Sequence, residues 1–332
     1  MLSTRLTDNT GAMALDPHAA LSKSEHALVR LAFAVRELGY HFITPTPATH
    51  ERVNARPGNI WAEDLRGVLG WSRPFKTGLL PPQVFELMRD ADMLEPSGDG
   101  WRSRLRLSSL NGLLCWHTAH PTTDPDAVFF GPDTYRFAQS IGQYLEKREM
   151  PLQRAMDMGC GTGAGALRVA LAWPEAEIWA GDINIQALRL AGVNAAIAGT
   201  RNVRTCQSNM LSGVDGDFDL VVANPPYLND SLKRSYRHGG GSHGQDLAVA
   251  MLRAALPRLR TGGTMLLYTG STIVDGRDTF LDDAQQVLAG LPTSWRWSYR
   301  EMDPDVFGEE LINPAYDDAE RIAAVVLQAT AS

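Results

Sequence analysis

Residues 152–172 read LQRAMDMGCGTGAGALRVALA, and this stretch decides the fold. Its first eight residues are mostly apolar and predict a buried strand. The glycines that follow predict a tight turn, and AGALRVALA predicts a helix. A strand, a glycine-rich turn and a helix form the first unit of a parallel sheet, which binds ligands beyond the carboxyl ends of its strands.

The same alternation continues to the end of the chain. Further strands are predicted at AEIWAGDI, VRTCQSN, FDLVVANPP and TMLLYTG, and helices at NIQALRLAGVNAAIAG, GQDLAVAMLRAALPRL and about residues 278–289. The last two segments, SWRWSYREM and ERIAAVVLQA, are predicted to be strands that pair antiparallel. The predicted fold class is therefore α/β, with a doubly wound, mostly parallel, seven-stranded Rossmann-like sheet.

The chain before residue 125 has a different pattern, typical of a smaller α+β domain of winged-helix-like type. A helix is predicted from His18 to Gly39, with five apolar residues on one stripe, and a Pro/Thr-rich connection follows at 44–58. Helices are predicted at 61–69 and from Pro82 to Leu94, and a β-hairpin at 95–118. The stripe consists of Leu21, Leu28, Leu31, Val35 and Leu38. We expect a substrate-recognition or lid domain at 1–125 and a catalytic domain at 126–332.

The charge is distributed unevenly along the 332 residues. The net charge is −7, but residues 1–120 hold 13 Lys and Arg against 12 Asp and Glu, or +1, and the remainder holds 18 against 26, or −8. Duplex DNA binding depends on neutralising phosphates, so this acidic second part argues against stable duplex DNA binding.

The cysteines and the lengths of the apolar segments indicate in which cellular compartment the protein is expected. Cys115, Cys160 and Cys206 have no CxxC spacing, which predicts buried fillers in a reducing compartment and no metal site. Residues 1–30 include the acidic residues Asp8 and Asp16, and no segment approaches 18 consecutive apolar residues. These features predict a cytoplasmic protein that does not enter a membrane.

Two features of the second part point to a nucleotide-like cofactor. The glycine-rich turn lets a ligand approach the backbone closely. Nineteen residues past Gly163, the second strand ends in Asp182, which is placed to accept hydrogen bonds from the two ribose hydroxyls of an adenosine. A helix N-cap is the alternative role for Asp182 alone, but it does not account for both features together.

The fourth predicted strand runs into VVANPPYLND, residues 221–230. Two consecutive prolines lack backbone donors and end a strand. With the glycine turn, this motif resembles the class I S-adenosylmethionine-dependent methyltransferases that carry Asn-Pro-Pro-Tyr. That branch includes release-factor glutamine methyltransferases and enzymes that methylate exocyclic amines of adenine and guanine in RNA or DNA. The resemblance covers residues 128–329.

The resemblance implies S-adenosyl-L-methionine as cofactor and assigns residues to its parts. The turn residues would line the methionine portion, Asp182 would hold the ribose, and Thr134, with Tyr135, would approach the sulfonium. Asn209 stands where the family usually has an acidic residue near the adenine amine, and the Met210 backbone N–H would face the ring. The turn residues meant are Asp157, Gly159, Gly161 and Gly163.

The Asn-Pro-Pro-Tyr motif suits nitrogen methylation. The lone pair of an amide or aromatic amine is delocalised, so its two N–H bonds must be held away from the methyl donor. The Asn224 side-chain oxygen and the Pro225 carbonyl can accept those hydrogens on a stiff loop, and Tyr227 can stack on the planar target. The alternative is a strand-ending turn with no chemical role.

The acceptor is less well specified. Arg102, Arg104 and Arg106 alternate on the predicted hairpin, as either a solvated face or a docking strip for RNA or an acidic partner. A polar loop at 228–245 either contacts substrate or is solvated, through Lys233, Arg234, Arg237, His238 and His243. A protein glutamine and an RNA base both fit. Alternatives are a small-molecule tailoring enzyme, including non-methylating use of the cofactor, and a noncatalytic binding module.

Overall fold

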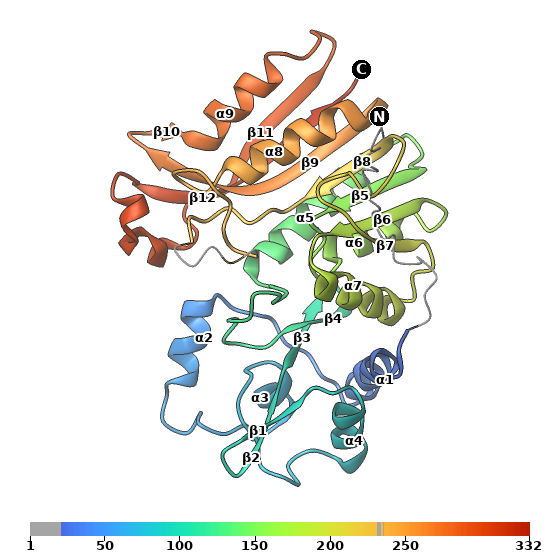
Figure 1. The fold of residues 1–332 in the computed structure, drawn as a ribbon, viewed down its shortest axis with the longest axis vertical. Coiled ribbons are helices and arrows are strands. Elements are labelled where there is room, and N and C mark those ends of the chain that lie inside the picture. The colour runs from blue at the N-terminus through green and yellow to red at the C-terminus, as the bar shows by residue number, and fades with distance from the viewer. Residues whose placement is uncertain (1–20, 231–233, 235) are drawn as a thin grey trace, which may run out of the picture.

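The computed structural model describes residues 21–230, 234 and 236–332. Figure 1 shows two parts, with a large sheet in one and small hairpins and helices in the other. The larger part carries the helices α5 (Pro132–Glu146), α6 (Ala164–Ala172), α7 (Ile185–Ala198), α8 (Asp246–Ala255) and α9 (Thr279–Leu288). Short 3-10 turns lie at Leu256–Arg258, Gly308–Ile312 and Pro314–Tyr316.

The sheet has the predicted topology. Its strand order is β11-β12-β9-β8-β5-β6-β7, and the short β10 pairs with the end of β9 as an eighth strand. The run from β9 to β7 is parallel. The last two strands, β11 and β12, pair antiparallel as predicted, and β12 also pairs antiparallel with β9. The strands are β5 (Arg154–Met158), β6 (Glu177–Asp182), β7 (Val203–Gln207), β8 (Phe218–Ala223), β9 (Leu259–Val274), β10 (Arg277–Asp278), β11 (Arg296–Asp303) and β12 (Arg321–Thr330).

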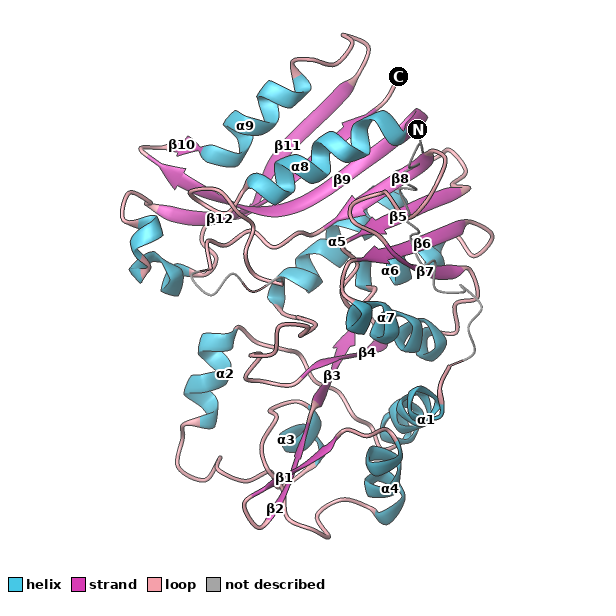
Figure 2. Ribbon diagram, viewed as in Figure 1, coloured by secondary structure: helices cyan, strands magenta, loops and turns pink. Residues whose placement is uncertain are grey.

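Both faces of the sheet are covered by helices, which is why the central strands are continuously apolar. Along β8, Leu220 and Val222 pack in a cluster with residues of α5 and α6. Val221 and Ala223 point the other way, into a cluster with residues of α8 and α9. Figure 2 shows these helices flanking the strands. The doubly wound α/β prediction is confirmed.

From residue 21 on, the described first part contains four helices and two hairpins. Its helices are α1 (Lys23–Glu37), α2 (Pro47–Asn54), α3 (Leu65–Leu69) and α4 (Pro82–Asp90). Its strands are β1 (Leu94–Ser97), β2 (Gly100–Ser103), β3 (Leu105–Leu110) and β4 (Leu113–Thr118). Two separate two-stranded sheets, β1-β2 and β3-β4, replace the single hairpin predicted at 95–118.

Helix boundaries in the first part differ from the predictions for local reasons. Ser22 caps α1 in a reciprocal capping box with Glu25, so the described helix begins at Lys23 and not at His18, a residue outside the described range. Of the stripe, Leu38 is 54% exposed because it is the C-cap. Sequence analysis also missed α2, which Thr46 caps and Pro47 opens.

The predicted arginine strip is wrong. Arg102 is held by the backbone, because its Nε donates to the Ser72 carbonyl at 3.2 Å and an Nη donates to the His120 carbonyl at 2.6 Å. Arg106 lies on a different hairpin and is only 3% exposed. Only Arg104 presents a largely exposed side chain, so the three guanidinium groups form no common surface.

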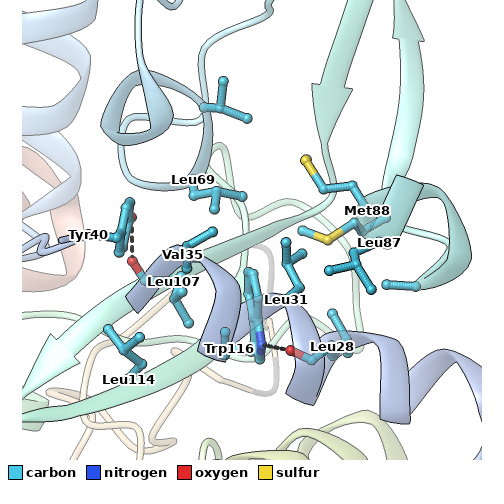
Figure 3. Close-up of a cluster of buried hydrophobic side chains, with 14 of the residues drawn as sticks. Leu28, Leu31, Val35, Tyr40, Leu69, Leu87, Met88, Leu107, Leu114 and Trp116 are labelled. Carbon is cyan, nitrogen blue, oxygen red and sulfur yellow. Dashed lines mark hydrogen bonds between the residues drawn. The ribbon is translucent and has the colours of Figure 1, made fainter. Parts of the chain in front are cut away.

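The two parts share one hydrophobic core. Buried side chains of α1, α4, β3 and β4 pack in a single cluster with residues of α7. In Figure 3 the Trp116 indole lies among Leu28, Leu31 and Val35, and its Nε1 donates to the Leu28 carbonyl at 3.1 Å. The first part is therefore fixed to the sheet domain through α7.

Asn194 of α7 adds a polar link inside this apolar contact. Its Oδ1 accepts from the Trp116 N–H at 2.8 Å, and its Nδ2 donates to the carbonyls of Trp116 (3.1 Å) and Thr162 (3.0 Å). Asn194 is fully buried, so its polar atoms and their backbone partners cannot hydrogen-bond to bulk water and are satisfied by one another. The link joins β4 to the glycine-rich turn.

Two further expectations can be compared with the structure. All three cysteines are free and buried, as predicted. Among the described residues, no helix is long and apolar enough to span a bilayer.

Candidate active site

A cavity opens beyond the carboxyl ends of the parallel strands, where the fold predicts a ligand. Its wall combines residues that follow β5, β6, β7 and β8 with the start of α5 and with Phe307 from the C-terminal segment. Nine predicted site residues line it: Thr134, Gly159, Gly161, Asp182, Asn209, Met210, Asn224, Pro225 and Tyr227. The other three, Asp157, Gly163 and Tyr135, do not. The Tyr135 hydroxyl instead accepts a hydrogen bond from the Thr44 N–H at 3.0 Å.

Asp182 is positioned by two backbone donors. Its Oδ2 accepts from the Gly161 N–H and its Oδ1 from the Asn184 N–H, both at 2.9 Å. Burial raises the pKa of this carboxyl, and the backbone hydrogen bonds oppose the increase. The N-cap of α7 is Asn184, whose Oδ1 accepts from the Gln186 N–H. The helix-cap alternative for Asp182 is therefore wrong, and its carboxylate faces the cavity.

The glycine-rich turn follows β5 and bends sharply. Gly159 and Gly161 have φ values of +72° and +52°, in the left-handed region that favours glycine. A Cβ on Gly161 would meet nothing within 4 Å, so this glycine is not required for packing. Its bare backbone forms a surface that a ligand can approach.

Asp157 and Gly163 form the layer behind this turn. The Asp157 Oδ2 accepts from the Ala166 N–H at 2.8 Å, and burial raises the pKa of this carboxyl to about 7. Gly163 allows close helix packing, since a Cβ there would lie 3.1 Å from the Ala191 Cβ. Both residues brace the turn, and neither lines the cavity.

The turn after β7 supplies the far end of the cavity. Asn209 is exposed, and Met210 has a left-handed φ of +55°. The Ser208 hydroxyl stabilises the turn by donating to the Met210 carbonyl at 2.9 Å and accepting from the Gly213 N–H at 2.9 Å. The two residues predicted to face an adenine ring therefore lie at the cavity, beside the strand that ends in Asp182.

The start of α5 contributes Asp133 and Thr134. The N-cap is Gly131, and the Thr134 hydroxyl, at the third helical position, accepts from the Gly131 N–H at 3.3 Å. The Asp133 carboxylate accepts from the Tyr268 hydroxyl at 2.6 Å and pairs with Arg136. Burial raises the pKa of Asp133 despite these contacts.

The Asn-Pro-Pro-Tyr segment leaves the end of β8 and turns along the cavity. Asn224 is half-buried and Pro225 is buried. The Tyr227 ring is 7% exposed, lies against Gly270 of β9 and meets the Phe307 ring edge-on at 6.0 Å. Burial first, and Asp133 next, raise the pKa of Tyr227. The ring is thus fixed in the wall, which leaves little free face for stacking.

The loop at 228–245 is tied to the C-terminal segment. Arg237 pairs with Glu310, His243 lies 3.0 Å from Asp318, and Asp230 pairs with Arg234. The described part of this loop is therefore more than a solvated stretch. Lys233 lies outside the described residues.

Tyr236 and Arg237 of this loop reach the cavity, and so do Phe129 and Phe307. The rings of Phe129 and Tyr236 are almost parallel, 6.4 Å apart between centroids. Sequence analysis missed Tyr236 and Phe307, because they come from loops with no periodic pattern. Pro304 and Gly308, on either side of Phe307, were the local signals of a turn there.

The residues present fit a nucleoside bound to an amino acid. The wall offers a carboxylate, Asp182, next to a bare glycine backbone, and apolar side chains such as Leu247 and Met251 line the remainder. In the described residues no group of three His, Cys, Asp or Glu side chains could hold a metal ion.

Comparison with known proteins identifies this arrangement. Residues 139–274 match the model of the methyltransferase small domain family. A release factor glutamine methyltransferase of Deinococcus radiodurans is 31% identical over 242 residues, which are 68% of this chain and 82% of that protein. A ribosomal protein uL3 glutamine methyltransferase of Bordetella pertussis is 35% identical over 133 residues, 36% of this chain and 45% of that protein.

Among solved structures, a tRNA m1G37 methyltransferase of M. jannaschii aligns with a TM-score of 0.46 and 17% identity, covering 69% of this chain and 57% of that one. The match to the Deinococcus protein spans most of that protein's length and agrees with the strand-end site. The chain belongs to the class I S-adenosylmethionine-dependent methyltransferases, in the branch that carries the Asn-Pro-Pro-Tyr motif.

Proposed function

We propose that this protein transfers the methyl group of S-adenosylmethionine to the side-chain amide nitrogen of a glutamine in a protein substrate. The observation that carries the proposal is that Asn224 and Pro225 line the same cavity as Gly161 and Asp182. The acceptor-holding and donor-holding residues thus share one enclosed space. The similarity to two kinds of glutamine methyltransferase supports an amide as the acceptor.

In the proposed reaction the cofactor supplies an electrophilic methyl carbon on a sulfonium. The amide nitrogen forms a bond to this carbon as the bond from carbon to sulfur breaks. The nitrogen then loses a proton, and S-adenosylhomocysteine and a methylated amide remain. The Asn224 side-chain oxygen and the Pro225 carbonyl accept the two N–H groups and so aim the lone pair at the methyl.

The cofactor would be held by the other end of the cavity. Asp182 would accept from the ribose hydroxyls, and Gly159 and Gly161 would let the amino-acid portion lie against the backbone. Thr134 would lie at the sulfonium end, and Asn209 and Met210 would contact the adenine. Asp157 and Gly163 would act indirectly, by supporting the turn.

An RNA base is the less favoured acceptor. The sequence argument for RNA rested on a strip of three arginines, and those side chains do not share a surface. We propose that residues 1–125 recognise the protein substrate as a fixed domain. The shared core with α7 favours this role over that of a mobile lid.

A labelled-methyl experiment tests the proposal. The purified protein is incubated with radiolabelled cofactor and a fractionated cell extract, and each fraction is digested to identify the labelled residue. We expect label in N-methylglutamine of a protein. Label in RNA or in a small metabolite, or no label at all, would overturn the proposed acceptor.

The Asn224→Ala variant tests the role of the amide acceptor. It should lower the methylation rate at least about a hundredfold, as loss of one preorganised hydrogen-bonding group does in other enzymes. Cofactor affinity should stay within about threefold, because the lost contact is to the acceptor. Asn313→Ala is the matched control, since the Nδ2 of Asn313 binds the Asn229 carbonyl on the loop and Asn313 does not line the cavity.

A further inference from the structure

The first part contains a buried cationic cluster that the proposed reaction does not use. Arg106 of β3 is 3% exposed, and neither its Nε nor its Nη1 has a hydrogen-bond partner among the described residues. The groups whose charge acts on Arg106 are two phenols, Tyr40 and Tyr135, and no carboxylate is among them. Burial of an unpaired cation costs several kcal/mol, so this guanidinium needs a compensating group.

Three histidines surround Arg106. His117 is its cross-strand partner on β4, and the rings of His50 and His120 lie 4.1 Å apart between centroids. Burial first, and the charge of Arg106 after it, lower the pKa of each histidine, and His120 also lowers that of His50. The pKa is about 3 for His50 and about 4 for His120. The imidazoles are therefore neutral beside a charged guanidinium.

The unpartnered atom of His50 is also a donor, and that of His117 is a donor in one of its two tautomers. The Asn54 side-chain amide lies 3.3 Å from the His50 Nδ1 and donates to it, which places the ring proton on Nε2. The His117 Nε2 lies 2.7 Å from the Ser108 hydroxyl, which in turn binds Thr44. When that hydroxyl donates, the ring proton is on Nδ1.

His50 Nε2 and His117 Nδ1 are both buried and make no hydrogen bond of ordinary geometry, although the Gly70 and Thr118 backbones lie close enough to act on the two rings. With the two Arg106 atoms they make four of the ten such side-chain atoms in the described part of the chain. This concentration in one cluster points to a single missing partner, because scattered packing faults would be distributed more evenly.

We propose that Arg106, His50, His117 and His120 form a binding site for one small oxyanion, a carboxylate or a phosphate group. Such a group accepts several N–H bonds and cancels the buried charge, which a water molecule cannot do. A guanidinium binds the two oxygens of a carboxylate or phosphate in parallel. His120, half-buried, is the most exposed member of the cluster and marks the side of entry.

The oxyanion site lies one layer behind the acceptor end of the active-site cavity. The His117 ring stacks on Phe130 at 5.0 Å, and the adjacent Phe129 lines the cavity. The loop that carries His120 also accepts, at the Thr122 carbonyl, a hydrogen bond of 2.6 Å from the cavity residue Tyr236. An anion bound here would therefore stiffen the segment that carries the acceptor wall.

Thermal unfolding with inorganic phosphate tests the site. The full-length protein is titrated with sodium phosphate in a zwitterionic buffer, and sodium acetate and sodium chloride are titrated in parallel at matched ionic strength. We expect Tm to rise saturably with phosphate, by about 4 °C when phosphate reaches 100 times its Kd. A larger response to acetate than to phosphate would assign the site to a carboxylate.

Two variants locate the response. Arg106→Met removes the charge at similar volume and should abolish the dependence on phosphate, whereas Arg104→Met, next to it but exposed, should retain it. If the wild type shows no shift with phosphate or acetate beyond that with chloride, the proposal is wrong. It is also wrong if Arg106→Met responds as the wild type does. The wild-type titration decides the question even if a variant fails to fold.

Discussion

The carboxylate of Asp182 and the backbone N–H of Gly161 are joined by a hydrogen bond of 2.9 Å. This bond connects the end of β6 to the turn after β5, and it fixes both at the cavity. Because Gly161 donates to Oδ2 and Asn184 to Oδ1, each oxygen still has a lone pair for a ligand hydroxyl.

Asp182→Ala should therefore weaken cofactor binding. Loss of hydrogen bonds from a charged acceptor costs about 1.5 to 3 kcal/mol, which corresponds to a 10- to 100-fold increase in Kd for S-adenosylmethionine. Isothermal titration calorimetry measures this directly. The exposed Asp99→Ala is a control far from the cavity. An unchanged Kd would remove Asp182 from the binding site.

The buried hydrogen bonds of Asn194 should contribute to the free energy of unfolding, because they join the two parts of the chain. Asn194→Ala leaves the Trp116 N–H and the carbonyls of Trp116 and Thr162 without partners in a buried place, so we expect a loss of about 3 kcal/mol in the free energy of unfolding. Urea unfolding, followed by tryptophan fluorescence, measures this loss. Asn194→Asp keeps the acceptor but buries a carboxyl group against two carbonyl oxygens, so it should be at least as destabilising as the alanine variant. A loss below about 0.5 kcal/mol for the alanine variant would show that water replaces these bonds.

Two variants distinguish a role of the Tyr227 ring from a role of its hydroxyl. The hydroxyl is buried near the Asp133 carboxyl but makes no hydrogen bond of ordinary geometry in the described structure, so Tyr227→Phe should change the free energy of unfolding by less than about 1 kcal/mol and retain methyl transfer. Gly270→Ala should instead lower the rate at least about tenfold, because its new Cβ would lie 2.1 Å from the Tyr227 Cδ2 and must displace the ring. Initial rates with the identified substrate check both variants. A large rate loss in Tyr227→Phe would mean that the hydroxyl takes part in the chemistry.

Acid should destabilise the protein through its buried histidines. Burial first, and Arg106 second, hold the pKa of His117 well below its ordinary value. The unfolded chain takes up a proton near pH 6.5 and the folded chain does not, so stability is highest above pH 6.5 and falls as the pH decreases. Between pH 7 and pH 5 this residue alone should cost about 2 kcal/mol.

His117→Gln should therefore lose less stability than the wild type over that pH range, by about 2 kcal/mol. Urea unfolding at pH 7 and pH 5 measures the difference. The exposed His41→Gln should follow the wild type. Equal losses in the wild type and in His117→Gln would contradict the buried, neutral state of this ring.

The strand-end residues could be predicted because their geometry is local. Parallel strands bring their carboxyl ends to one edge, so the residues after four apolar runs had to meet there. The positions of Asn224 and Asp182 at the cavity could therefore be predicted from the strand pattern alone. Asp157 was the exception, because its place in the same motif did not reveal that the side chain turns back to bind the start of α6.

Tertiary packing decided what the sequence could not. Arg106 alternates with apolar residues, as an exposed strand residue would. His50 of α2 and His120 of the 118–130 connection both lie near it, so these two segments cover Arg106 and exclude it from water. Leu38 fits the apolar stripe of α1, but the helix ends before it. Tyr236 and Phe307 reach the cavity from loops, whose paths depend on long-range ion pairs such as Arg237 with Glu310.

The cavity wall is formed by two kinds of structural element, strand ends and surface loops. The groups that would hold the methyl donor stand on strand ends, where a shift would disturb the whole sheet, whereas Tyr236 and Phe307 stand on surface segments that tolerate change. Substitutions in those segments can therefore change which substrate is accepted during evolution, while the residues that bind the methyl donor stay the same.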